Sequence, residues 1–117
     1  MNDIDLQKAV YAALSADPSL GHTPVVKYYE DADGQYPFVV YKEISNVPAL
    51  HADNVEIAAR VTYQISIVTN DDDYASIESA VKRIMNGLGL IRVDSQELHD
   101  DNDYTKVLRY CRAVDAD

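Results

Sequence analysis

The stretch from Val55 to Asn70, VEIAARVTYQISIVTN, alternates apolar and other side chains over an unusual length. Apolar side chains stand at every second position from Val55 to Ile67, and mostly polar ones fill the positions between. Because successive side chains of a strand point to opposite faces of a sheet, the pattern predicts one two-faced strand over 55–69. Such a strand has about 15 residues, whereas ~5–6 is usual.

A strand of this length has two explanations, and the sequence leaves both open. It can outrun its neighbours and project beyond the core, where another subunit can pair with it or pack on it. Alternatively, it can bend at a bulge and serve two parts of one core.

Two segments have helical spacing of apolar residues. The first helix is expected over Asp3–Ala16, with Asn2 or Asp3 as its cap and Asp17-Pro18 as its end, since the residue before proline disfavours helical conformation. Its expected apolar stripe comprises Ile4, Val10, Ala13 and Leu14, with Ala9 nearby.

The second helix is expected over about 72–88 and ends at Gly87 and Gly89. Asn70 to Asp73 offer caps and negative charge at its start. Its core-facing stripe is Tyr74, Ile77, Val81, Ile84 and Leu88, reinforced by Ala80 and Met85.

The remaining strands are shorter. They are expected over 25–29, 38–45, 90–94 and 104–114, with a hairpin-type turn at Asp33-Gly34 and loops over 46–53 and 95–103. The order is αβββαββ in a single domain over residues 1–117. We therefore predict an α+β fold, with an antiparallel or mixed β-sheet and two helices packed on one face of it.

The charge of the chain limits its partners. Twenty acidic residues against ten basic ones give a formal charge of −10, which disfavours ordinary DNA or RNA binding. A DNA-mimicking inhibitor of a host defence enzyme would also be small and acidic, so that class stays open. The acidic N-terminus, MNDIDLQKAV, is unlike a signal peptide, and no apolar run is long enough for a membrane span. We expect a soluble, cytoplasmic protein.

The sequence offers little chemistry. His22, His51 and His99 fall in expected loops without metal-ligand spacing, and the acidic runs at 71–73 and 100–103 lack the ligand ladder of a calcium loop. Cys111, the single cysteine, excludes an intrachain disulfide and fits a buried strand position better than a catalytic one. No nucleophile elbow or phosphate loop is present. We predict no catalytic residue, no metal and no cofactor, although a small enzyme stays as a third class.

Four arginines lie on expected strands of this acidic chain: Arg60, Arg92, Arg109 and Arg112. They can pair with carboxylates of the same sheet or, in a homo-oligomer, with acidic loops of a neighbour.

From Pro37 onward the chain resembles a known family. The matching features are the YPF strand entry, the YQISI strand with its polar turn, the IESAVKRIM helix, GLGLIR, and a closing KVLRY after an acidic gap. In order and spacing they are similar to the small tail-completion, or tail terminator, proteins of phages and prophages of Gram-positive bacteria. The resemblance covers about two-thirds of the chain and implies a fold of two helices on a β-sheet.

The same resemblance implies a structural protein without catalysis. Such proteins form a ring, expected to be hexameric, that caps the tail tube and presents a face to the head connector. The partners are then other copies of the chain, the tail tube protein and the head connector protein. The expected locations are the host cytoplasm during assembly and the head-proximal end of the tail in the virion.

A ring needs two complementary surfaces on each subunit. We expect the long strand and the loop NVPALHADN to supply subunit contacts, and the candidate residues are Val47, Leu50, His51, Arg60, Ile65 and Arg109.

Overall fold

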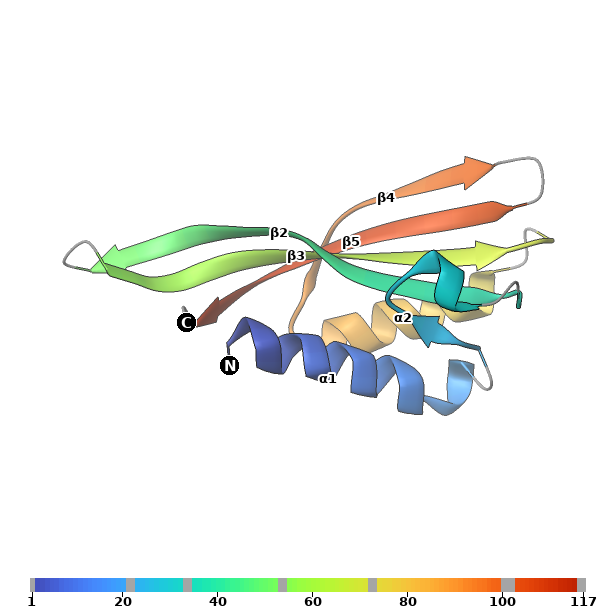
Figure 1. The fold of residues 1–117 in the computed structure, drawn as a ribbon, viewed down its shortest axis with the longest axis horizontal. Helices are drawn as coiled ribbons and strands as arrows, with labels where there is room; N and C mark the ends of the chain where they lie inside the picture. The colour runs from blue at the N-terminus through green and yellow to red at the C-terminus, as the bar shows by residue number, and fades with distance from the viewer. Residues whose placement is uncertain are drawn as a thin grey trace.

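The computed structural model of the protein describes residues 2–20, 23–32, 35–52, 55–71, 74–99 and 103–115. Its elements in chain order are α1 (Asp3–Ala16), the 3₁₀ turn η1 (Pro18–Leu20), β1 (Val25–Val26), the 3₁₀ turn η2 (Tyr29–Ala32), β2 (Phe38–Ala52), β3 (Val55–Thr69), α2 (Ala75–Gly87), β4 (Ile91–His99) and β5 (Tyr104–Asp115). Figure 1 shows both helices on the same face of the sheet. The predicted α+β fold and its αβββαββ order are confirmed.

The strands form one mixed sheet in the order β1-β2-β3-β5-β4. β1 runs parallel to β2, and the other neighbouring pairs are antiparallel. β3 occupies the centre, and its bounds are those that the alternation predicts. It pairs with β2 along its whole length and with β5 from Ala58 to Thr69, so the long strand is the spine of the sheet.

The main core lies between β3 and the helices. Alternate β3 side chains are buried from Ala59 to Ile67, and the α2 stripe covers them with Ile77, Ala80, Val81, Ile84 and Met85. From α1, the core takes Leu6, Val10 and Leu14. The prediction that Ile4 belongs to the α1 stripe is wrong, since Ile4 is 56% exposed. Asp3 is 9% exposed, and one buried face that holds residues 3, 6, 10 and 14 turns Ile4 outward.

β2 differs most from its prediction. The chain over 46–52, expected as a loop, continues β2 and pairs with β3 as far as Ala52. Pro48 suggested a loop because proline cannot donate a backbone hydrogen bond, but proline is tolerated on an edge strand and at bulges. Both conditions hold here: register shifts flank Leu50, and this part of β2 lies at the sheet edge.

The chain before β2 also departs from the expected hairpin. The strand predicted over 25–29 is limited to Val25–Val26, and it pairs in parallel with Val39 and Val40. Asp33 and Gly34, where the turn was expected, lie outside the described residues. A parallel neighbour needs a crossover, and this crossover includes the segment around η2. It packs Ala32 on Phe38 and Val68 in a second, smaller apolar cluster. Since Val68 alternates with Ile67, this cluster lies on the face opposite the helices.

α2 begins at Ala75 with Tyr74 at the cap position, and the Tyr74 side chain makes no capping hydrogen bond. Of the predicted caps, Asn70 and Asp71 lie before that point, while Asp72 and Asp73 lie outside the described residues. The helix ends as predicted near its glycines. Gly89 adopts a φ of 80°, and the N–H groups of Gly89 and Leu90 bond back to the carbonyls of Asn86 and Met85.

β4 extends through His99, beyond the predicted strand 90–94. Residues 95–99 therefore belong to a strand and not to the acidic loop. All nine side chains of β4 are exposed, so no apolar alternation was needed there, and the sequence pattern could not reveal this edge strand.

The molecule is elongated. Its extents are 52 × 27 × 23 Å, and its radius of gyration is 15.1 Å, where about 13 Å is typical of a chain of this length. In Figure 1, the hairpin of β2 and β3 reaches well past the start of α1. We call residues 46–52 of β2 and 55–60 of β3 the arm. The projecting alternative is thus correct for β3, although β2 does carry bulges.

Candidate subunit interface

The arm exposes apolar side chains on both faces. Exposed fractions are 48% for Val47, 54% for Leu50, 61% for Val55 and 45% for Ile57. Residues 46–52 contain no Asp, Glu, Lys or Arg in a chain whose formal charge is −10. Exposed apolar surface that is depleted in charge is typical of the buried centre of a protein interface.

Four of the predicted contact residues come together on the arm. Val47 lies opposite Arg60 in the register of β2 and β3, and Leu50 and His51 follow on the same strand. All four are exposed, and Arg60 makes no ion pair with another described residue. His51 lies in a strand, not in a loop as predicted.

The other two predicted contact residues do not join them. Ile65 is fully buried among the residues of the main core, because it stands on the helix-facing side of β3, and it cannot contact a neighbour. Arg109 on β5 is half-buried and donates both contacts of its Nη1 to the Asp94 carboxylate of β4, at 3.2 Å each. This arginine pairs within its own sheet.

Two further arginines also find partners nearby. Arg112 donates from Nη1 to the Leu88 carbonyl at 2.7 Å, just after α2. Arg92 donates from Nη1 to Ser95 Oγ at 3.2 Å, within β4. Arg92 thus finds its partner within the sheet, whereas Arg112 bonds to the end of α2. Of the four strand arginines, Arg60 has no such contact with another described residue.

A buried polar cluster stands where the arm leaves the core. Tyr63 donates from its hydroxyl to Asp3 Oδ1 at 2.7 Å, and Asn46 donates from Nδ2 to Asp3 Oδ2 at 3.3 Å. Glu43 joins the cluster through a hydrogen bond with Asp3, one residue before the register shift in β2. The β2 side of the arm is therefore held by side-chain hydrogen bonds to α1 as well as by backbone hydrogen bonds to β3.

The pKa values of the two carboxyl groups in this cluster, Glu43 and Asp3, are shifted in opposite directions. Burial raises the pKa of Glu43 to about 7, with help from the hydrogen bond and the negative charge of Asp3. Burial also acts to raise the pKa of Asp3, but hydrogen bonds from Glu43, Tyr63 and others outweigh it, so the pKa of Asp3 is lowered. Glu43 is thus the proton donor and Asp3 the acceptor over much of the range below neutral pH.

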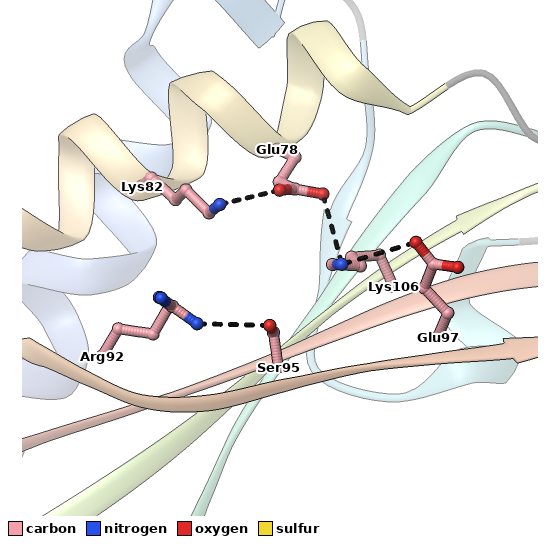
Figure 2. Close-up of polar contacts among 6 residues, drawn as sticks. All are labelled: Glu78, Lys82, Arg92, Ser95, Glu97 and Lys106. Atoms are coloured by element: carbon pink, nitrogen blue, oxygen red, sulfur yellow. Dashed lines mark hydrogen bonds and ion pairs between the residues drawn. The ribbon is translucent and has the colours of Figure 1, made fainter.

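β4 is a second candidate surface, which the sequence reading missed. Its apolar side chains Ile91, Val93 and Leu98 are 69%, 57% and 48% exposed. Figure 2 shows how its inner side is tied to the body: Lys106 of β5 lies 3.5 Å from a Glu97 oxygen and 3.9 Å from a Glu78 oxygen of α2. Glu78 in turn pairs with Lys82 at 2.8 Å.

The β4 end of the sheet is also fixed from its other face. Asp103, directly before β5, accepts hydrogen bonds from the hydroxyls of Tyr29 and Tyr36. These bonds lower the pKa of Asp103 and raise that of Tyr29. The segment around η2 is thereby joined to the start of β5.

Among the described residues, no three side chains of His, Cys, Asp or Glu gather as metal ligands would. His99 stacks on Tyr104 at a centroid distance of 4.3 Å, and Asp103 is engaged by tyrosines. His22, Asp100 and Asp101 lie outside the described residues. Cys111 is half-buried in β5. Across the described part of the chain, no helix has the length and apolar character that crossing a membrane requires.

Comparison with known proteins finds solved structures that resemble this chain and one protein family that matches its sequence. The gene transfer agent virion contains a chain of the same fold, with a TM-score of 0.68 at 18% identity over 95% of both chains. The structure of the bacteriophage SPP1 gp17 protein is less similar, with a TM-score of 0.48 at 20% identity over 92% of this chain and 88% of that one. No curated protein matches significantly. The sequence profile of the family Tail completion protein gp17 matches residues 8–109. Since this match spans most of the chain, the protein belongs to the gp17 family of phage tail completion proteins, as the resemblance predicted.

Proposed function

We propose that this phage tail protein forms a ring of identical subunits that caps the tail tube and joins it to the head connector. The observation that carries the proposal is the arm, which exposes charge-poor apolar surface on both faces and extends beyond the core. Exposed apolar surface of this kind is a liability in a monomer and is stabilised by burial against a partner.

The shape of the subunit favours a ring over a closed dimer. The arm lies at one end of the elongated molecule, and the last residues of β4 and the first residues of β5 lie at the other (Figure 1). Contacts between two different surfaces are head-to-tail, and they close into a ring when the rotation allows it. A hexamer is the expected ring. It is assembled in the host cytoplasm and occupies the head-proximal end of the tail.

The partners in this proposal are other copies of the chain, the tail tube protein and the head connector protein, with no cofactor and no recognition of nucleic-acid sequence. Membership of the gp17 family favours this function over an acidic DNA mimic and over a small enzyme. No bond is made or broken, since the work is done by complementary surfaces.

The test is tail completion by variants of the arm. Val47→Asp places a charge on the arm without touching the core, whereas Ile4→Asp places the same charge on an equally exposed apolar position of α1, near the helix start that tolerates acids. Both proteins are checked for native circular dichroism and thermal unfolding. We expect Val47→Asp to give tails separated from filled heads in electron micrographs and Ile4→Asp to give complete particles. Complete particles from a folded Val47→Asp protein would overturn the role of the arm.

A further inference from the structure

The sheet has two open edges on opposite margins. Within the described ranges, β5 is the single strand neighbour of β4. On the other margin, β1 covers Val39 and Val40 of β2, and β2 from Tyr41 to Ala52 has β3 as its only strand neighbour among the described residues. Both edges therefore present unpaired backbone N–H and C=O groups, which another strand can satisfy.

β4 has the features of an edge that is covered in an assembly. It is a nine-residue strand with every side chain exposed, and three of those side chains are large and apolar. Natural proteins shorten, charge or cover such edges, because long apolar ones pair with other chains. The contacts in Figure 2 lie on the helix side of the strand and leave its outer backbone free.

The open edge of β2 has a groove beside it. The chain turns away after β1, at Lys27 and Tyr28, and this leaves a groove of about 620 Å³ that Lys42 and Gln64 also line. Lys27 and Lys42 are exposed and form no ion pair with the described residues around them. Glu43 also lines the groove, and Lys27 acts on its carboxyl, whose pKa is about 7. The groove thus holds two lysines against one carboxyl group that is protonated below neutral pH.

β4 carries the complementary charge. Its Asp94 and Glu97 side chains are 49% and 68% exposed, although each already contacts one cation on β5. A carboxylate with this exposure can contact a second cation across an interface. The negative charges on the edge of β4 are therefore complementary to the lysines beside the edge of β2. Within one chain these two edges cannot pair with each other, because β3 and β5 lie between them.

We propose that β4 of one copy pairs with the open edge of β2 of the next copy, so that the sheets of neighbouring subunits become continuous. This inference rests on the proposed ring and specifies its contact. Within one subunit β4 runs antiparallel to β2, since β2 and β5 share a direction and β4 opposes β5. Rotation about an axis along the strands preserves direction, so the new ladder is antiparallel, with the stagger that closed sheets require.

Cross-linking between the two edges tests the pairing. The experiment uses the substitutions Gln96→Cys on β4 and Val47→Cys on β2. Gln96 is paired with Val107 and Val47 with Arg60, and these pairs place both positions on the face opposite the helices. They are made together in a Cys111→Ala background, and a short bis-maleimide joins cysteines that come close. Single-cysteine proteins and an equimolar mixture of the two singles serve as controls, with light scattering of every sample over a concentration series.

We expect the double variant to give a ladder of dimers, trimers and larger species on denaturing gels. The mixture of singles should stop at dimers, because each molecule then has one reactive edge, and each single alone should give none. Strong dimers from Gln96→Cys alone would show β4 pairing with itself and overturn the proposal. An oligomer by light scattering without any ladder would overturn the pairing but leave the ring. A monomer at every concentration, again without a ladder, would overturn both.

Discussion

Tyr63 donates a hydrogen bond to Asp3 at 2.7 Å and so joins the centre of β3 to the first residue of α1, 60 positions earlier. Both residues are buried, at 0% and 9% exposure. The bond therefore satisfies part of the hydrogen-bonding capacity of a buried carboxylate.

Removing that hydroxyl should destabilise the fold. Tyr63→Phe keeps the ring in place but leaves Asp3 with the longer bond from Asn46 and with Glu43 and Gln7 as partners. We expect a loss of about 1–3 kcal/mol in the free energy of unfolding, measured by urea denaturation. Tyr28→Phe, at a tyrosine that is 62% exposed, is the matched control and should change stability by less than about 0.5 kcal/mol. Equal effects of the two variants would contradict the role of the bond.

Stability should fall as pH rises toward neutrality because of Glu43. Its folded pKa of about 7 lies above the ordinary value of 4.5, so between these values the folded state binds more protons than the unfolded state. That contribution is complete below pH 4.5 and is lost as pH rises through 7. The lowered pKa of Asp3 acts in the opposite sense, but only at lower pH.

Glu43→Gln should therefore flatten the pH dependence. Urea denaturation between pH 5 and pH 8 should show a decrease in the wild type of roughly 1–2 kcal/mol, and a much smaller one in the variant. Glu56→Gln neutralises an exposed carboxylate on the arm and should keep the wild-type slope. A variant slope equal to that of the wild type would remove Glu43 as its source.

Substitution by alanine at the two glycines near the end of α2 should change the free energy of unfolding in opposite directions. Gly87 lies in the helix, and an added Cβ would meet no atom within 4 Å, so Gly87→Ala should stabilise by about 0.5–1 kcal/mol. Gly89 has a φ of 80°, which is unfavourable for a side chain although the added Cβ would be 3.7 Å from Arg112. Gly89→Ala should cost about 1 kcal/mol. Thermal unfolding of both variants checks the difference in sign.

Ile65 should matter to the core and not to assembly. Ile65→Ala removes buried methyl groups at a fully enclosed position and should cost about 2–5 kcal/mol in unfolding free energy. Val47→Ala, on the arm, should cost less than about 1 kcal/mol, because that side chain is half exposed. A small loss for Ile65→Ala would contradict the packing of β3 against the helices.

Local signals explain which elements the sequence predicted well. The bounds of α1 follow from the Asn2 cap, whose Oδ1 accepts the Asp5 N–H at 2.9 Å, and from Asp17-Pro18. β3 follows from its strict alternation. In each case the deciding residues are neighbours in the chain, so no knowledge of the tertiary structure is needed.

The missed features depend on distant partners. Residues 46–52 become a strand because β3 offers a ladder that outweighs the weak strand preference of Asn46 and Pro48. β4 extends to His99 because β5 pairs with it, although its side chains stay exposed on both faces. Ile65 looked like a surface candidate because a long strand was expected to project, but only its Val55 end does so.

One strand, β3, is both the backbone of the core and one side of the arm. A pull on the arm along its length is thus transmitted to the folded body as shear across many ladder hydrogen bonds at once. These bonds would have to break together, whereas peeling would open them one by one. In the proposed ring between tail and head, this geometry would resist mechanical load.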